Sequence, residues 1–258
     1  MIEPDRKPAA VDDGDIAEVW DRLADDWQIQ VGDDGDTNRR LNSDPVLRDL
    51  LGDVAGLDLL DAGCGTGYLA RELAAKGARV VGVDVSPKMI AIAREQAPDI
   101  DFRVDTLTGL ASVDDAAFDR VVANYVLMDT PDLDAAVRSF HRVLRPGGVA
   151  VLVFSHPCFP QGAAHARGEE TVEYRWEFSY FDETRRVDPP WAHFRSEFVW
   201  FHRPLSQYWQ AFAAAGFTVV GLEEPRIGPD RFHLAGNPRK LAKLKSRPYS
   251  IAFKLLKA

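Results

Sequence analysis

Apolar and polar positions alternate in a regular order along the middle of the chain, between residues 57 and 154. Short apolar runs typical of buried strands are separated by segments whose apolar residues recur every three to four positions, the period of an amphipathic helix. Strands that alternate with helices form a parallel sheet with right-handed crossovers. The pattern therefore predicts an α/β fold, with strands at 57–61, 79–84, 100–105, 118–125 and 149–154, and helices at 68–76, 87–96 and 132–144.

The N-terminal part of the chain departs from this pattern. Residues 1–14 have no apolar period and are predicted to be disordered. Residues 16–27 have helical spacing, with Asp15 as the expected N-cap. A polar loop at 32–45 and a short helix at 46–51 complete the segment before the first strand.

The C-terminal part begins with a break in the alternation. Residues 155–204 hold many aromatic side chains and no clean βα unit, although parts of them alternate like strands. We interpret them as an insertion that packs over the sheet edge on the substrate side. Regular structure resumes with a helix at 206–216 and strands at 217–224 and 248–256. We therefore expect residues 1–258 to form a single domain.

Composition narrows the functional classes. The chain has 258 residues, 46% of them apolar, which is enough for one domain with a substantial core. The longest apolar run, 149–154, is far too short to span a membrane. The net charge of −9 disfavours a nucleic-acid partner, which would need a basic face. Cys64 and Cys158 give neither a disulfide framework nor metal-ligand spacing, so we expect a cytoplasmic protein without a metal.

The most informative stretch is 57-LDLLDAGCGTGYLARELAAKG-77, where a strand runs through a glycine-rich turn into a helix. Gly63, Gly65 and Gly67 have the spacing G-x-G-x-G, whereas the dinucleotide fingerprint requires G-x-G-x-x-G. The strand also ends in Asp61, whose carboxylate would repel a phosphate but suits an ammonium or a sulfonium. The turn therefore favours a cationic ligand that carries no phosphate.

Two further acids end strands in the same part of the chain. Asp84 ends the second strand and could accept hydrogen bonds from both hydroxyls of a ribose. Asp105 ends the third strand and could accept one from an adenine amino group. Ligands in parallel sheets bind beyond the carboxyl ends of the strands, so Asp61, Asp84 and Asp105 are expected to line one crevice.

Five stretches in this order resemble the successive motifs of the class I S-adenosylmethionine-dependent methyltransferases: DAGCGTG, GVDVS, VDTL, FDRVVANYVLMD and HRVLRPGGVAVLVF. More narrowly, they are similar to bacterial small-molecule methyltransferases of the ubiquinone and menaquinone biosynthesis type. The resemblance covers residues 45–155, and 201-FHRPLSQYW-209 extends it. It implies a Rossmann-like, mostly parallel sheet of seven strands in the order 3-2-1-4-5-7-6, with helices on both faces and the last strand antiparallel.

The resemblance also implies the ligand and its contacts. S-adenosylmethionine would be the cofactor and S-adenosylhomocysteine the product. The 1–45 segment would contribute a helical lid over the cofactor. The residues expected to bind the cofactor are Asp61, Gly63, Cys64, Gly65 and Gly67 at the methionine moiety, Asp84 at the ribose, Val85, Met89, Asp105 and Thr106 at the adenine, Asn124 near the sulfonium, and Trp20 and Arg39 from the N-terminal segment.

Methyl transfer mainly requires alignment of donor and acceptor, and a hydroxyl or acidic carbon acceptor also gains from a general base. His156 follows the strand at 149–154, at the edge where an acceptor would lie, and is the first candidate base. His202 and Tyr125 are the other candidate catalytic residues. An aromatic-walled pocket indicates a small organic acceptor.

Several alternatives remain open at this point. A nicotinamide oxidoreductase is disfavoured by the glycine spacing and by Asp61. The same crevice could serve an enzyme that uses the cofactor for a reaction other than methylation, or a regulatory protein without turnover. The protein is expected to be a monomer or a homodimer.

Overall fold

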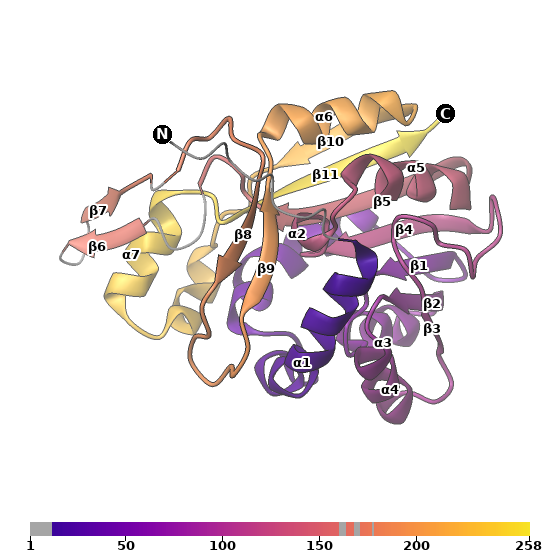
Figure 1. The fold of residues 1–258 in the computed structure, drawn as a ribbon, viewed down its shortest axis with the longest axis horizontal. Coiled ribbons are helices and arrows are strands. Elements are labelled where there is room, and N and C mark those ends of the chain that lie inside the picture. Colours follow the sequence, from indigo (N-terminus) through magenta and orange to yellow (C-terminus); the bar gives the residue numbers. More distant parts are fainter. Residues whose placement is uncertain (1–11, 160–163, 168–170, 177) are drawn as a thin grey trace, which may run out of the picture.

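A seven-stranded sheet forms the centre of the computed structural model, which describes residues 12–159, 164–167, 171–176 and 178–258 (Figure 1). Along the sheet the strands lie in the order β10-β11-β5-β4-β1-β2-β3. Their bounds are β1 Asp58–Ala62, β2 Arg79–Asp84, β3 Asp101–Val104, β4 Phe118–Asn124, β5 Leu144–Ser155, β10 Phe217–Glu223 and β11 Ser250–Lys257. Counted along the chain, these seven strands follow the order 3-2-1-4-5-7-6. The pairings from β3 to β5 are parallel, and β11 is antiparallel to both neighbours. The expected fold is confirmed.

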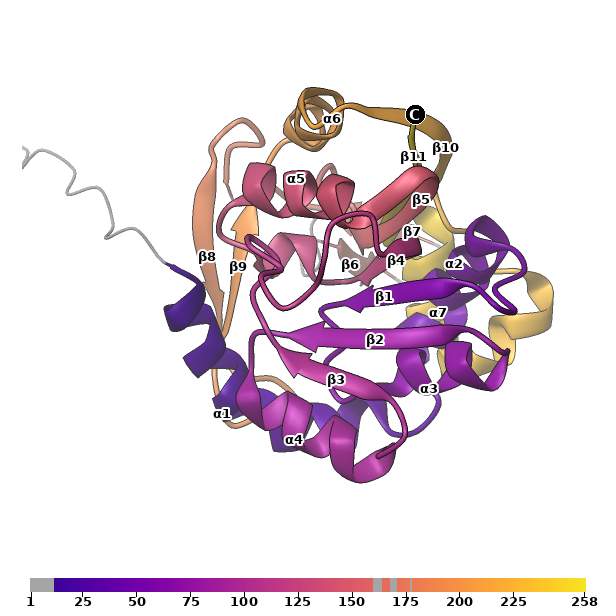
Figure 2. The same ribbon diagram turned by 90° about the vertical axis from the view of Figure 1, so that its right-hand side faces the viewer.

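Helices cover both faces of this sheet. One face packs against α2 (Asp44–Leu51), α3 (Tyr68–Ala75) and α4 (Pro87–Gln96), and the other against α5 (Leu133–Val143) and α6 (Leu205–Ala214). Figure 2 shows α5 and α6 on one side of the sheet and α4 on the other. Side chains alternate across a strand, so neighbouring apolar residues of β1 enter different cores. Leu59 and Leu60 are both fully buried, the first against α2 and α3 and the second against α5.

Local capping decides where the helices begin. Ser86 is the N-cap of α4, as predicted: its hydroxyl accepts a hydrogen bond from the Met89 N–H, and Pro87 occupies the first turn. The predicted start of α1 (Asp13–Val31) was wrong by three residues. Its N-cap is Asp12, which forms a reciprocal capping box with Asp15. Residues 1–11 of the predicted disordered start lie outside the described residues.

The insertion is built from two short antiparallel hairpins. One pairs β6 (Ala164–Arg167) with β7 (Thr171–Tyr174), and the other pairs β8 (Thr184–Asp188) with β9 (Phe198–His202). Helix α1 packs against the second hairpin through a small apolar cluster of Ile16, Val19, Leu23, Phe194 and Val199. The N-terminal helix therefore joins the insertion to the rest of the fold.

Four helical elements were absent from the sequence prediction. They are the π-helical turn η1 (Arg39–Ser43), two short 3-10 helices, η2 (Leu127–Asp129) and η3 (Pro229–Ala235), and helix α7 (Pro238–Ser246). The start of α7 does have a local signal, because Asn237 caps the Lys240 N–H and Pro238 follows it. In the described part of the chain, no helix is long and apolar enough to cross a membrane.

Candidate active site

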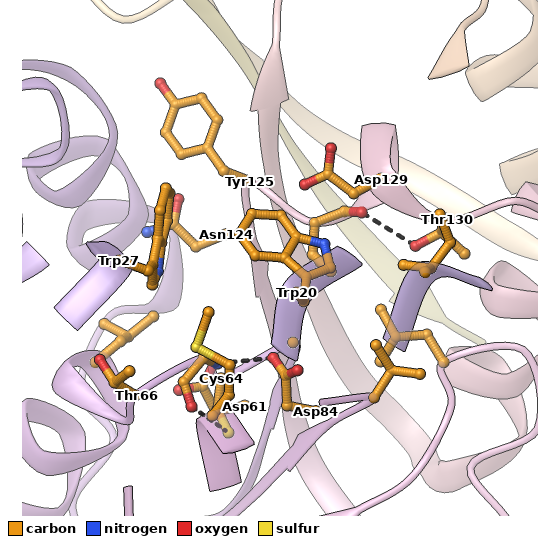
Figure 3. A pocket seen from close by; sticks show the side chains of 18 of the residues that line it. Trp20, Trp27, Asp61, Cys64, Thr66, Asp84, Asn124, Tyr125, Asp129 and Thr130 are labelled. Atoms are coloured by element: carbon orange, nitrogen blue, oxygen red, sulfur yellow. Dashed lines mark hydrogen bonds between the residues drawn. The ribbon is translucent and has the colours of Figure 1, made fainter. Parts of the chain in front are cut away.

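A narrow cleft lies beyond the carboxyl ends of β1, β2 and β4 (Figure 3). Asp61, Asp84 and Asn124 come from these strand ends, and the glycine turn closes one side. Parallel strands present their carboxyl ends at the same sheet edge, which is why residues separated by more than 60 positions meet here. Of the residues predicted to bind a cofactor, the cleft is lined by Trp20, Arg39, Asp61, Gly63, Cys64, Gly65, Asp84, Val85, Met89 and Asn124.

The glycine turn needs its glycines for their left-handed backbone and, at two positions, because there is no room for a side chain. All three have a left-handed backbone, with φ of 77° at Gly63, 53° at Gly65 and 82° at Gly67. A Cβ at Gly63 would lie 2.4 Å from the Val126 side chain, and one at Gly67 would lie 2.8 Å from the Phe102 ring. Gly65 instead borders the open cleft. Gly67 does not line the cleft and serves the packing of α3 against β3.

Two carboxylates give the cleft its electrostatic character. Asp61 is 2% exposed, and burial together with the nearby Asp84 raises its pKa to about 7. Burial raises the pKa of Asp84 to about 6, although its two oxygens accept hydrogen bonds from the Ser86 and Gly65 N–H groups. Asp61 Oδ2 has no hydrogen-bond partner among the described residues. The cleft therefore offers unneutralised acceptors, which suits a ligand with positive charge or hydroxyl donors.

The prediction for Asp105 and Thr106 was wrong in position, since neither lines the cleft. The Asp105 carboxylate turns back onto its own loop, where it accepts hydrogen bonds from the Thr106 and Ser112 N–H groups at 2.8 and 2.6 Å. Leu107 lines the cleft in their place, together with Val85 and Met89. This side of the cleft is therefore apolar and suited to a flat heterocycle.

Helix α1 covers the cleft with two tryptophans. Trp20 and Trp27 meet edge to face, with ring centroids 5.2 Å apart, and both line the cleft. The helix is fixed to α4 by Asp21, which accepts a hydrogen bond from the Lys88 N–H, and by an ion pair between Lys88 and Asp25 at 2.7 Å. The N-terminal helix thus occupies the position expected of a lid.

Arg39 extends into the cleft from the π-helical turn. Its guanidinium is 4.9 Å from the Trp27 ring centroid and 5.4 Å from that of Tyr125, and it pairs with Asp36 at 3.0 Å. Arg39 is only 5% exposed, and its Nε has no partner in the described part of the structure. A buried guanidinium with an unused donor suits a carboxylate ligand.

Asn124 belongs to a buried hydrogen-bond network. Its Nδ2 donates to the Tyr68 hydroxyl at 2.8 Å and to Asp44 Oδ1 at 3.3 Å. The Tyr68 hydroxyl also donates to Asp44 at 3.2 Å. The amide nitrogen is thereby committed to the protein, whereas Asn124 Oδ1 lacks a partner among the described residues.

A second, larger cavity of about 630 Å³ adjoins this cleft. Trp20, Trp27, Arg39, Tyr125 and Asp129 line both spaces, so they form the boundary between them. Tyr125 has a φ of 58°, unusual for a residue with a side chain and characteristic of functional sites. The insertion and α7 complete the wall of the larger cavity, which has the size of a small-molecule site.

Asp129 is the site residue that the sequence analysis missed. It lines both cavities, and Figure 3 shows its side chain beside Thr130. Burial raises the pKa of Asp129 well above its usual range, and the nearby Arg39 and Arg203 only partly oppose this effect. A signal was present, because Asp129 ends the motif 118-FDRVVANYVLMD-129, but a residue of the short 3-10 helix η2 could not be placed from spacing alone.

His156 and His202 line the larger cavity and not the cleft. His156 Nδ1 accepts a hydrogen bond from the Cys158 N–H, so the ring proton is on Nε2, 3.0 Å from Glu224. His202 Nε2 donates to the Tyr180 carbonyl at 2.9 Å. Burial lowers the pKa of both rings. Both nitrogens of His156 are therefore used within the protein, which argues against it as the base.

Comparisons with known proteins agree with this geometry. Residues 60–152 match the family model described as a methyltransferase domain. A ubiquinone biosynthesis O-methyltransferase of Xanthomonas oryzae is 37% identical over 100 residues, which cover 37% of this chain and 42% of the relative. A demethylmenaquinone methyltransferase of Chlorobaculum tepidum is 41% identical over 109 residues, which cover 41% of this chain and 43% of the relative. The chain thus spans less than half the length of these two curated relatives.

A solved structure extends the similarity beyond this segment. The crystal structure of an S-adenosylmethionine-dependent methyltransferase from Mesorhizobium loti has a TM-score of 0.69 and 27% identity, over 82% of this chain and 96% of that one. No cluster of three or more histidine, cysteine, aspartate or glutamate residues suited to a metal ion occurs in the part of the chain that the structure describes. The sheet order, the glycine turn with its two acids, and these similarities all match a class I S-adenosylmethionine-dependent methyltransferase.

Proposed function

We propose that the protein transfers a methyl group from S-adenosylmethionine to a small organic acceptor, with S-adenosylhomocysteine as the second product. The observation that carries the proposal is the cleft itself: the buried Asp61, the partly buried Asp84 and a glycine turn lie at one sheet edge, beside a cavity of about 630 Å³. The names of the similar proteins support methyl transfer as the reaction.

The residues of the cleft fit the parts of this cofactor. The unpartnered oxygen of Asp61 and the glycine turn suit the methionine ammonium, and Asp84 suits the two ribose hydroxyls. Val85, Met89 and Leu107 supply an apolar wall for the adenine, and Arg39 suits the carboxylate. When bound, the cofactor supplies an electrophilic methyl group on a sulfonium.

The chain's own residues would then align the acceptor and take up its proton. We assign the general base to Asp129, because its carboxylate lies at the boundary between the cleft and the acceptor cavity. A raised pKa strengthens a carboxylate as a base, and a base of this kind contributes about 10²–10⁴-fold. Tyr125 and the two tryptophans of α1 would exclude water around the reacting atoms.

The cytoplasm remains our proposed location, since both cysteines are free thiols.

Calorimetric titration with S-adenosylhomocysteine, with NADH in parallel, tests the proposal. Binding in the micromolar range is expected for the first ligand alone, and Asp84→Asn should abolish it. Asp105→Asn is the matched control, because Asp105 directly follows the neighbouring strand β3 but does not line the cleft. Binding of NADH but not of S-adenosylhomocysteine would contradict the proposal.

A further inference from the structure

One wall of the larger cavity carries three cationic side chains. Lys240 and Lys243 come from α7, and Arg247 follows directly after this helix. Figure 1 shows α7 beside the β6–β7 hairpin, away from α3 and α4, and residue contacts between α7 and both strands confirm this position. The cationic group therefore belongs to the acceptor cavity and not to the cofactor cleft.

These cations have no carboxylate partner among the described residues. The other two arginines of the cavity differ from them: Arg39 pairs with Asp36, and Arg203 donates to the carbonyl groups of Leu127, Thr130 and Pro131. The chain as a whole carries a net charge of −9. Cations without a carboxylate partner therefore line this cavity in an acidic protein: Lys243 and Arg247 are partly buried, and Lys240 is exposed.

Arg247 has a guanidinium donor that the described residues leave unused. Its Nη1 donates to the Phe159 carbonyl at 3.0 Å, but its Nε is buried without a partner in the described residues. The guanidinium lies 5.3 Å from the Tyr174 ring and 5.8 Å from the Tyr249 ring. Burial lowers the pKa of Arg247, and no carboxylate of the described residues is among the groups that oppose this effect. A bound anion would offset the cost of burying the Arg247 charge, which the described residues do not offset.

The remaining wall of the cavity is mostly aromatic. Trp20, Trp191, Phe198, Trp200 and Phe201 contribute indole and phenyl faces from α1, the insertion loop and β9. Such a wall stacks on flat apolar rings. Three acids also line the cavity; Asp36 is neutralised by Arg39, Asp129 lies at the cleft boundary, and Asp188 is exposed on β8.

From this combination we propose that the methyl acceptor is an aromatic organic anion: its ring lies against the tryptophan and phenylalanine side chains, and its carboxylate is bound by Lys240, Lys243 and Arg247. The inference rests on the proposed function, since it takes the larger cavity as the acceptor site. It adds a substrate class and three specificity-determining residues. Because the anionic group is fixed at α7, it would orient the ring edge that reaches Asp129.

The test compares 1-naphthoate with the neutral 1-naphthamide, which has the same ring system, by calorimetric titration of the full-length protein. The variant is Lys240→Gln/Lys243→Gln. The matched control is Arg239→Gln/Lys245→Gln, which removes the same charge from the same helix at positions that do not line the cavity. Titration with S-adenosylhomocysteine on each protein reports on the cofactor cleft independently.

The wild-type protein should bind 1-naphthoate at least tenfold more tightly than 1-naphthamide, a difference typical of charge-assisted contacts. The cavity variant should lose most of this preference, while the control variant keeps it. Equal affinity for the two probes, binding of neither, or equal loss in both variants would overturn the inference. Loss of S-adenosylhomocysteine binding with an intact naphthoate preference would instead refute the proposed function and leave the anion site standing.

Discussion

Gly63 provides the sharpest test of how the glycine turn is built, because the chain contains a matched control. Gly63 and Gly147 have nearly the same backbone, with φ of 77° and 76°. A Cβ at Gly63 would lie 2.4 Å from Val126 Cγ2, whereas one at Gly147 would meet nothing within 4 Å. Alanine at the two positions therefore differs in one respect, the contact with Val126.

Two costs determine the expected loss of stability, one from the backbone conformation and one from the contact with Val126. The left-handed backbone costs an alanine about 1–2 kcal/mol of folding free energy at either position. Forcing a methyl group into a packed site adds about 1–3 kcal/mol. Gly147→Ala should therefore lower the free energy of unfolding by about 1–2 kcal/mol, and Gly63→Ala by about 2–5 kcal/mol.

Urea unfolding followed by tryptophan fluorescence measures both values. With a slope of about 1–3 kcal/mol per molar urea, the midpoint of Gly63→Ala should lie about 1 M below that of Gly147→Ala. Adding Val126→Ala should restore part of the loss at Gly63 and none at Gly147. Equal midpoints for the two single variants, or no rescue by Val126→Ala, would refute the steric account of the turn.

Three further predictions concern the charged groups of the site. The pKa of Asp61 is about 7 in the folded protein and near 3.8 unfolded, so the folded state binds the extra proton between these values. The free energy of unfolding of the ligand-free protein should therefore fall as pH rises from about 4 to 7. Urea titrations at each pH should show a smaller pH dependence for Asp61→Asn. An unchanged pH dependence would contradict the raised pKa of Asp61. Asp129→Asn should lower kcat by about 10²–10⁴-fold for a hydroxyl acceptor. It should leave the Kd for S-adenosylhomocysteine within about twofold. If kcat and the affinity for S-adenosylhomocysteine fell by the same factor, Asp129 would not be the base. Arg39→Ala should weaken S-adenosylhomocysteine binding by about 10–100-fold, as expected for a charge-assisted hydrogen bond, and unchanged affinity in calorimetry would remove Arg39 from the cofactor site.

Much of the cofactor cleft could be predicted because its geometry is local. A strand, a left-handed turn and a helix leave little choice of residue at Gly63, Gly65 and Gly67. The parallel arrangement then places Asp61 and Asp84 at the same sheet edge, since each ends a strand. Strand-end residues are therefore positioned by the pattern of the chain itself.

Loop residues were harder to place, and the errors have a common cause. Asp105 follows a strand as Asp84 does, but its carboxylate finds backbone N–H donors in its own loop and turns away from the cleft. His156 is likewise held by Glu224 and by the Cys158 N–H. A polar side chain goes where its hydrogen bonds are satisfied, and these partners depend on how distant segments pack.

The sequence by itself determined the turn and the two acids of the cleft, because each follows from backbone constraints within a few residues or from the rules that govern parallel strands, and its resemblance to a known family implied the sheet order. Only the tertiary structure decided that Asp129 borders both cavities and that Lys240, Lys243 and Arg247 line one wall of the larger one. Asp129 comes from η2, and the three cations come from α7 and the residue after it; packing across the insertion sets the positions of these elements. Long-range packing of this kind leaves no periodic trace in the sequence.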